Sequence, residues 1–125
     1  MPGRVRRIVV IANLACAVAL LVLGLLPELP AVATGISDHT AHALAYAVQA
    51  GLLFALFLPS VGAGMAALLA AAIAVLYGGF VEALQLLQPA RAAEILDLAA
   101  NAAGAVLAAS IAYLLIRLRK AGDGR

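Results

Sequence analysis

The sequence predicts an all-α integral membrane protein, a bundle of four transmembrane helices with cytoplasmic N- and C-termini. Of its 125 residues, 66% belong to the hydrophobic set AVILMFWYC and 11% are charged, whereas soluble domains are about 45–50% apolar and about 25% charged. A chain this short has a high surface-to-volume ratio, and its polar side chains are too few to cover a surface in water. The apolar residues also form four long runs, and seven of the eight basic residues lie near the two ends.

This composition excludes a soluble enzyme, a disordered chain and a secreted disulfide scaffold. The single cysteine, Cys16, lies in an apolar run and cannot form an internal disulfide. No basic run is interleaved with aromatic residues, so no nucleic-acid partner is expected. Sheets are excluded because lipid tolerates only helices and closed barrels, and continuous apolar runs do not alternate as barrel strands do.

Four apolar runs are long enough to cross the membrane, which takes about 20 residues. They cover residues 8–26, 38–58, 63–87 and 95–116. A proline follows each of the first three runs, at Pro27, Pro59 and Pro89. Proline cannot continue the backbone hydrogen-bond ladder of a helix, so we expect each of these runs to end there.

The basic residues predict the direction of the four spans. They flank the first run at Arg4, Arg6 and Arg7 and the last at Arg117, Arg119 and Lys120. An even number of crossings leaves both ends on one side, and the positive-inside bias makes that side the cytoplasm. We therefore expect a basic cytoplasmic N-terminus over 1–7, a four-helix membrane domain over 8–118 and a basic cytoplasmic tail over 119–125.

An alternative for the first run is a cleaved signal peptide. The basic N-terminus, the apolar run and the sequence Ala31-Val32-Ala33 together resemble that pattern, although the run exceeds the usual length of about 7–15 residues. Cleavage would leave three spans without altering their direction.

Polar residues follow one face of each of the last three predicted helices. The second helix has Asp38, His42, Tyr46 and Gln49 at spacings of 4, 4 and 3 residues. The third has Glu82 and Gln85 three residues apart, and the fourth has Glu94, Asp97 and Asn101 at spacings of 3 and 4. Residues at these spacings share a helix face, and all of them fall in the outer half of the membrane. Because a polar group in hydrocarbon is costly, we expect the three faces to share one outward-opening cleft.

These residues resemble the VanZ-like family of small membrane proteins, named after a teicoplanin-resistance accessory protein. The resemblance covers residues 38–108 and rests on Asp38, His42 and Tyr46; Tyr77, Gly78, Glu82 and Gln85; and Arg91, Asp97, Asn101 and Gly104. His39 and Ala43 depart from the family pattern, which often has lysine and an aromatic residue there. The resemblance implies a multi-pass protein of the bacterial plasma (inner) membrane, tied to glycopeptide tolerance or the cell envelope, and supplies no established reaction.

An outward cleft at this depth would meet the head group of an amphiphile. We therefore expect it to bind a lipid-linked precursor or a lipoglycopeptide. Arg91 precedes the last helix, whose N-terminus also favours anions, so a phosphate or carboxylate is expected beside it. The candidate ligand-binding residues are Arg91, Asp38, His42, Tyr46, Glu82, Gln85, Asp97 and Asn101.

Two alternatives remain open. In the first, the chain is a membrane enzyme with acid/base chemistry on an envelope lipid, and its candidate catalytic residues are Asp38, His42, Glu82 and Asp97. In the second, the polar residues join helices in a structural or assembly protein. The sequence does not decide between a monomer and a homodimer.

No cofactor and no metal is expected. His42, Glu82 and Asp97, with His39 or Asp38, are donors that suit Zn²⁺, but no paired metal-ligand motif accompanies them. The chain also lacks a phosphate-cradling glycine loop and a nucleotide-binding fingerprint. Ser37, next to this polar set, is expected to cap the helix that follows it.

Overall fold

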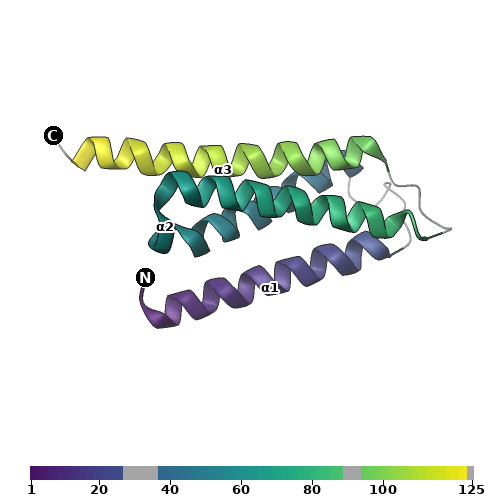
Figure 1. Ribbon diagram of the computed structural model, residues 1–125, viewed down its shortest axis with the longest axis horizontal. Helices are drawn as coiled ribbons and strands as arrows, with labels where there is room; N and C mark the ends of the chain where they lie inside the picture. The colour runs from purple at the N-terminus through teal and green to yellow at the C-terminus, as the bar shows by residue number, and fades with distance from the viewer. Residues whose placement is uncertain (27–36, 89–93, 124–125) are drawn as a thin grey trace.

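The protein is all α-helical in the computed structural model, which describes residues 1–26, 37–88 and 94–123. Its helices are α1 (Gly3–Leu25), α2 (Asp38–Gln85) and α3 (Ile95–Asp123) (Figure 1). Each of the three is long and apolar enough to cross a membrane. The predicted all-α membrane class is therefore confirmed.

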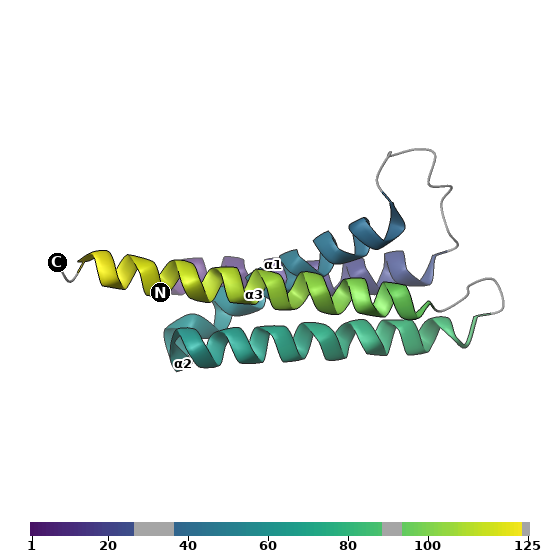
Figure 2. The ribbon, with the colours of Figure 1, turned by 90° about the horizontal axis from the view of Figure 1, so that it is seen from above.

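The predicted count of four helices is wrong over the described residues, because α2 covers both the second and the third predicted run. Pro59 lies inside this 48-residue helix instead of ending it. The backbone leaves the helical conformation at Gly62, with φ 78° and ψ 168°, a conformation that glycine adopts without the steric cost other residues incur. There α2 folds back on itself (Figure 2), and we name its two parts the first arm (38–61) and the second arm (63–85).

The start of α2 is fixed by Ser37, as predicted. The Ser37 hydroxyl accepts a hydrogen bond from the backbone N–H of Thr40 at 3.2 Å and lies 2.7 Å from the Thr40 hydroxyl. This cap satisfies one of the free N–H groups at the helix N-terminus. It places Asp38 and His39 in the first turn of α2.

Small residues allow the two arms and α3 to approach closely. The most buried hydrophobic residues are mainly alanines, namely Ala50, Ala66, Ala70, Ala74, Ala105 and Ala109. At Gly104 there is no room for a side chain, because a Cβ atom would collide with the backbone of Ala43. At Gly78 a Cβ atom would crowd Tyr46 and Asn101. These two glycines thus permit close helix contact, and this closeness brings the polar faces together.

Helix α1 is held to α2 by polar contacts along its length. Gln49 Nε2 donates to the side-chain oxygen of Asn13 at 2.8 Å, and the Tyr77 hydroxyl donates to the carbonyl of Ala17 at 2.6 Å. Near the end of α1, Gln85 Nε2 donates to the carbonyl of Gly24 at 2.8 Å. The opposite face of α1 exposes large apolar side chains, including Ile8, Ile11, Leu14 and Val18, which suits contact with lipid.

The two ends of the bundle differ in charge. Both termini lie at the end where α2 reverses, and the starts of α2 and α3 lie at the other (Figures 1 and 2). Among the described residues, the terminal end carries Arg4, Arg6, Arg7, Arg117, Arg119 and Lys120. The polar faces predicted from the sequence meet at the opposite end.

Candidate functional site

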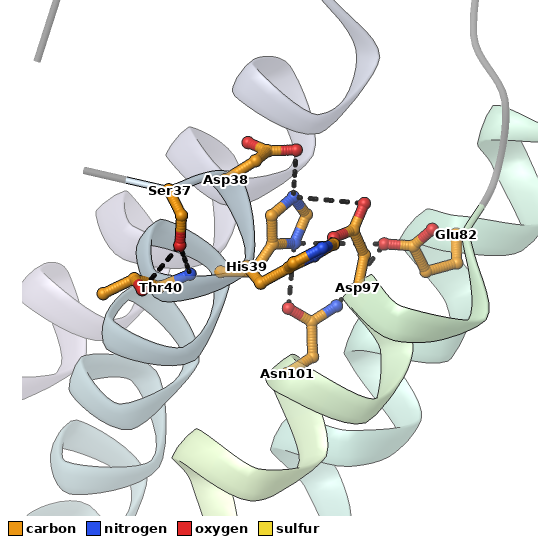
Figure 3. A network of polar contacts seen from close by, with 8 residues as sticks. Ser37, Asp38, His39, Thr40, Glu82, Asp97 and Asn101 are labelled. Carbon is orange, nitrogen blue, oxygen red and sulfur yellow. Dashed lines mark hydrogen bonds and ion pairs between the residues drawn. The ribbon is translucent and has the colours of Figure 1, made fainter. Parts of the chain in front are cut away.

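Six polar side chains gather at the end of the bundle where α2 and α3 begin, away from the termini (Figures 1 and 2), and Figure 3 shows contacts among them from close by. They come from the first arm of α2, from its second arm and from α3. We name them the polar cluster, which consists of Asp38, His39, His42, Glu82, Asp97 and Asn101. Three segments far apart in the sequence thus contribute to one site.

His42 has carboxylates on several sides. Its Nε2 atom lies 3.8 Å from Asp38 Oδ2, on the same helix face one turn earlier, and 3.9 Å from Asp97 Oδ2 on α3. Its Nδ1 atom lies 4.0 Å from Glu82 Oε1 on the second arm. All three separations exceed the range of a direct hydrogen bond, so these contacts are electrostatic.

Asn101 joins His42 to Glu82 from within the bundle. Its Oδ1 atom lies 3.0 Å from His42 Nδ1, and its Nδ2 donates to Glu82 Oε1 at 3.5 Å. Because an amide oxygen only accepts, His42 Nδ1 carries the hydrogen and donates it to Asn101. The other ring nitrogen, Nε2, faces the carboxylates of Asp38 and Asp97.

The shortest contact in the cluster involves a residue outside the predicted site. His39 Nδ1 lies 2.6 Å from Asp97 Oδ1, yet from the sequence His39 was expected only as a departure from the family pattern and as an optional metal ligand. Its spacing of three residues before His42 was the available signal, since it places both rings on one side of the first turns of α2.

The polar cluster has an exposed rim and a buried interior. The side chains of Asp38 and His39 are 60% and 46% exposed. Those of His42, Asp97 and Glu82 are 17%, 9% and 8% exposed. A molecule arriving from outside the bundle would therefore meet Asp38 and His39 first.

Five of the eight predicted ligand-binding residues lie in the cluster, and two lie elsewhere. Tyr46 is buried one turn below His42 and packs beside Gly78. Gln85 turns away and binds the carbonyl of Gly24 on α1. The remaining residue, Arg91, lies outside the described residues.

Two surface hollows lie away from the cluster. One of about 710 Å³ is lined only by α1, including Ile11, Leu14 and Val18. The other, of about 290 Å³, is lined by Gly64, Ser110 and Tyr113 among others. None of the cluster residues lines either hollow. Among the described residues, the cluster side chains contact one another across the two arms of α2 and α3. These are the helices that were expected to line the cleft.

Two sets of residues in and beside the cluster have the donor types and spacing to hold a metal ion. One consists of Asp38, His42 and Asp97, and the other of His39, Glu94 and Asp97, and in each set the ligand atoms lie within 4.8 Å of one another. They differ in that the second set contains the 2.6 Å contact between His39 and Asp97.

Comparison with known proteins agrees with the resemblance seen in the polar residues. The sequence matches the VanZ/LLP1 family over residues 5–117, which is most of the chain. No curated protein and no solved structure matched it. Since the family match covers most of the chain and includes part or all of each of the three helices, the chain belongs to the VanZ/LLP1 family.

Proposed function

We propose that this VanZ/LLP1-family membrane protein binds the head group of a cell-envelope amphiphile through the polar cluster. The ligand is a lipid-linked precursor or a lipoglycopeptide, and its binding links the protein to teicoplanin-type glycopeptide tolerance. The observation that carries the proposal is the gathering of Asp38, His42, Glu82, Asp97 and Asn101 from three segments at one end of the bundle.

The proposal includes a location in the bacterial plasma (inner) membrane, with the cluster facing outward. A straight helix of 48 residues would be about 72 Å long at 1.5 Å per residue, more than twice the roughly 30 Å of hydrocarbon. Each arm of α2 therefore crosses once, and with α1 and α3 the chain crosses four times. Six basic residues at the terminal end favour cytoplasmic termini under the positive-inside rule.

The chemistry of the cluster suits a hydroxyl- and amine-rich head group. Carboxylates accept hydrogen bonds from such groups, and the exposed rim residues Asp38 and His39 are within reach of the outer leaflet in this orientation. Arg91, in the sequence between the cluster residues Glu82 and Asp97, supplies a positive charge for a phosphate or carboxylate of the same ligand.

A purely structural role accounts less well for the cluster. Elsewhere the same helices pack largely through uncharged side chains, as at Leu53, Ala70 and Ala105. A charged side chain in a membrane helix costs about 2.5–3.5 kcal/mol at the centre of the bilayer, even on insertion scales. Packing alone gives no reason to retain Glu82 and Asp97 in the interior beside His42.

Binding can be tested with the purified chain in phospholipid nanodiscs, titrated by calorimetry with two probes. The first is teicoplanin and the second is a short-chain polyprenyl diphosphate. We expect the wild-type chain to bind one of them, and Glu82→Gln and Arg91→Ala to weaken that binding at least tenfold. Asp123→Asn and Arg119→Ala are the matched controls, because they remove one negative and one positive charge at the terminal end. Their affinity for the probe should stay within twofold of wild type.

Three outcomes would contradict the proposal. One is that neither probe binds the wild-type chain. Another is that Glu82→Gln lowers the folded yield while its folded fraction binds normally, which identifies a structural role. A third is that mass spectrometry finds the polyprenyl diphosphate consumed on incubation with the wild-type chain, which identifies an enzyme.

A further inference from the structure

We propose that Asp38, His42 and Asp97 form a binding site for a divalent cation. Three ligand atoms from two helices surround one point: Nε2 of the imidazole lies 3.8 Å from Asp38 Oδ2 and 3.9 Å from Asp97 Oδ2. One ligand atom from each of the three residues lies within 4.8 Å of the others. These separations are too long for hydrogen bonds and match the spacing of ligands around an ion.

The size of this triangle fits a metal ion. Three ligand atoms within 4.8 Å of one another have a common centre within about 2.8 Å of each, against about 2.0–2.2 Å for zinc–nitrogen and zinc–oxygen bonds and about 2.3–2.6 Å for calcium–oxygen bonds. A shift of less than about 1 Å in Asp38, whose side chain is 60% exposed, would bring the ligands to zinc distances. An imidazole with two carboxylates favours borderline ions such as Zn²⁺ and Mn²⁺.

The outer contacts of two ligands direct the correct atoms toward this centre. His42 donates its Nδ1 hydrogen to Asn101 Oδ1 at 3.0 Å, which leaves the Nε2 lone pair facing the two carboxylates in the neutral ring. Asp97 uses Oδ1 for the 2.6 Å contact with His39, which leaves Oδ2 facing His42. Metal-binding histidines almost always donate their second ring nitrogen in this way, and ligating carboxylates are hydrogen-bonded in turn.

The charge of the cluster also favours a cation. Carboxylates of Asp38, Glu82 and Asp97 all lie within 4.0 Å of one imidazole ring, and like charges repel strongly where the dielectric constant is low. A divalent ion between Asp38 and Asp97 would offset this repulsion. Because Asp38 is exposed, the ion has a path of entry from the rim.

The second set of donors is the weaker candidate. His39 and Asp97 are in direct contact at 2.6 Å, so an ion joining them to Glu94 must first break that contact. The first set requires no contact to be broken, since its nitrogen–oxygen separations are 3.8 and 3.9 Å.

A bound cation would deepen the proposed function. It would place positive charge within an acidic cluster and let that cluster receive the phosphate of an envelope amphiphile. This consequence rests on the proposed function, whereas cation binding itself does not, and the two are separable by experiment.

Cation binding is measured on the tag-free full-length chain in detergent micelles, without either amphiphile probe. Dialysis against EDTA first removes bound metal, the EDTA is then removed, and Zn²⁺ is added and its unbound excess washed away. We expect one Zn²⁺ per chain by elemental analysis, and a visible absorption band when Co²⁺ is added instead. Asp38→Asn is the decisive variant because its exposed side chain can change without disturbing the interior. It should weaken Zn²⁺ binding at least tenfold, and Glu94→Gln, the matched loss of an exposed carboxylate at a helix start, should stay within twofold.

The proposal is overturned if wild-type chain holds no stoichiometric Zn²⁺. It is also overturned if Glu94→Gln and His39→Asn weaken Zn²⁺ binding while Asp38→Asn does not, because the ion then lies in the second set. If the chain binds Zn²⁺ but neither amphiphile probe, the site stands and the proposed function fails. If the EDTA-treated chain binds a probe and no Zn²⁺, the proposed function stands and the cation site fails.

Discussion

The imidazole of His42 and the amide of Asn101 share a hydrogen bond of 3.0 Å that ties the first arm of α2 to α3. Asn101 is almost fully buried, at 1% exposure, and its amide nitrogen reaches Glu82 on the second arm. One neutral amide therefore determines which nitrogen of His42 carries hydrogen and which faces Asp38 and Asp97. Replacing it should affect both the stability and the chemistry of the cluster.

Asn101→Leu should lower the free energy of unfolding by about 1–3 kcal/mol, because it leaves a polar hydrogen of His42 and an oxygen of Glu82 without the amide that binds them. The measurement is reversible unfolding in mixed detergent micelles, followed by circular dichroism. Ser110→Ala, on an exposed position of the same helix, is the control and should change little. Equal stability of the Asn101 and Ser110 variants would show that the amide bridge contributes nothing.

Gly104→Ala should reduce the yield of folded protein, because the added methyl group collides with the backbone of Ala43 on the first arm. Backbone cannot move aside as a flexible side chain can, so α3 must shift away from α2. Gly51→Ala is the matched control: it lies inside α2, and its added Cβ atom would meet nothing within 4 Å. That variant should fold as well as wild type or better, since alanine favours helix over glycine by about 1 kcal/mol. Size-exclusion profiles of the solubilised variants check both, and comparable folded yields would refute the close contact.

Asn13 and Gln49 should show energetic coupling in a double-mutant cycle. Gln49 donates to Asn13 at 2.8 Å, while Asn13 Nδ2 and Gln49 Oε1 have no hydrogen-bond partner among the described residues. Hydrogen bonds between membrane helices have measured couplings of about 0.6 kcal/mol on average and about 1.7 at most. Each single leucine variant should be destabilised, and the double variant should be less destabilised than their sum, because it removes the unpartnered atoms as well. Additive effects would mean that the pair does not hold α1 to α2.

Helix periodicity was enough to predict most of the polar cluster. The spacing of Asp38 and His42, and that of Asp97 and Asn101, fixes a shared face on each helix whatever lies next to it. The cost of polar groups in lipid then favours one meeting point. The family assignment followed from the same residues and is confirmed over 5–117.

Other features depend on neighbours that spacing alone does not identify. Gln85 lies three residues after Glu82 and so was expected on the same helix face, yet its side chain binds Gly24 on α1. Packing sets how the second arm is rotated between its neighbouring helices, and spacing does not reveal that rotation. Asn13 is an isolated polar residue in the interior of α1, without the periodic companions that would have drawn attention to it.

The position of the turn between the two arms was also not predicted correctly from the sequence. Pro59 was the expected terminator, since it lacks a backbone N–H, but the helical assignment continues past it. The break falls at Gly62, the one described residue with positive φ. Four other glycines lie within the same helix, namely Gly51, Gly64, Gly78 and Gly79, so glycine content alone did not mark the position.

The orientation proposed for the bundle predicts opposite labelling of its two ends. In a Cys16→Ser background, Gln88→Cys places a thiol just after the second arm, and Ala121→Cys places one among the basic residues near the end of α3. In intact spheroplasts, a membrane-impermeant maleimide should label Gln88→Cys, and it should label Ala121→Cys only after permeabilisation, because the positive-inside bias retains Arg117, Arg119 and Lys120 in the cytoplasm. Gel-shift of the labelled chain measures both. If Ala121→Cys alone were labelled in intact spheroplasts, the cluster would face the cytoplasm. There it could not meet a head group of the outer leaflet.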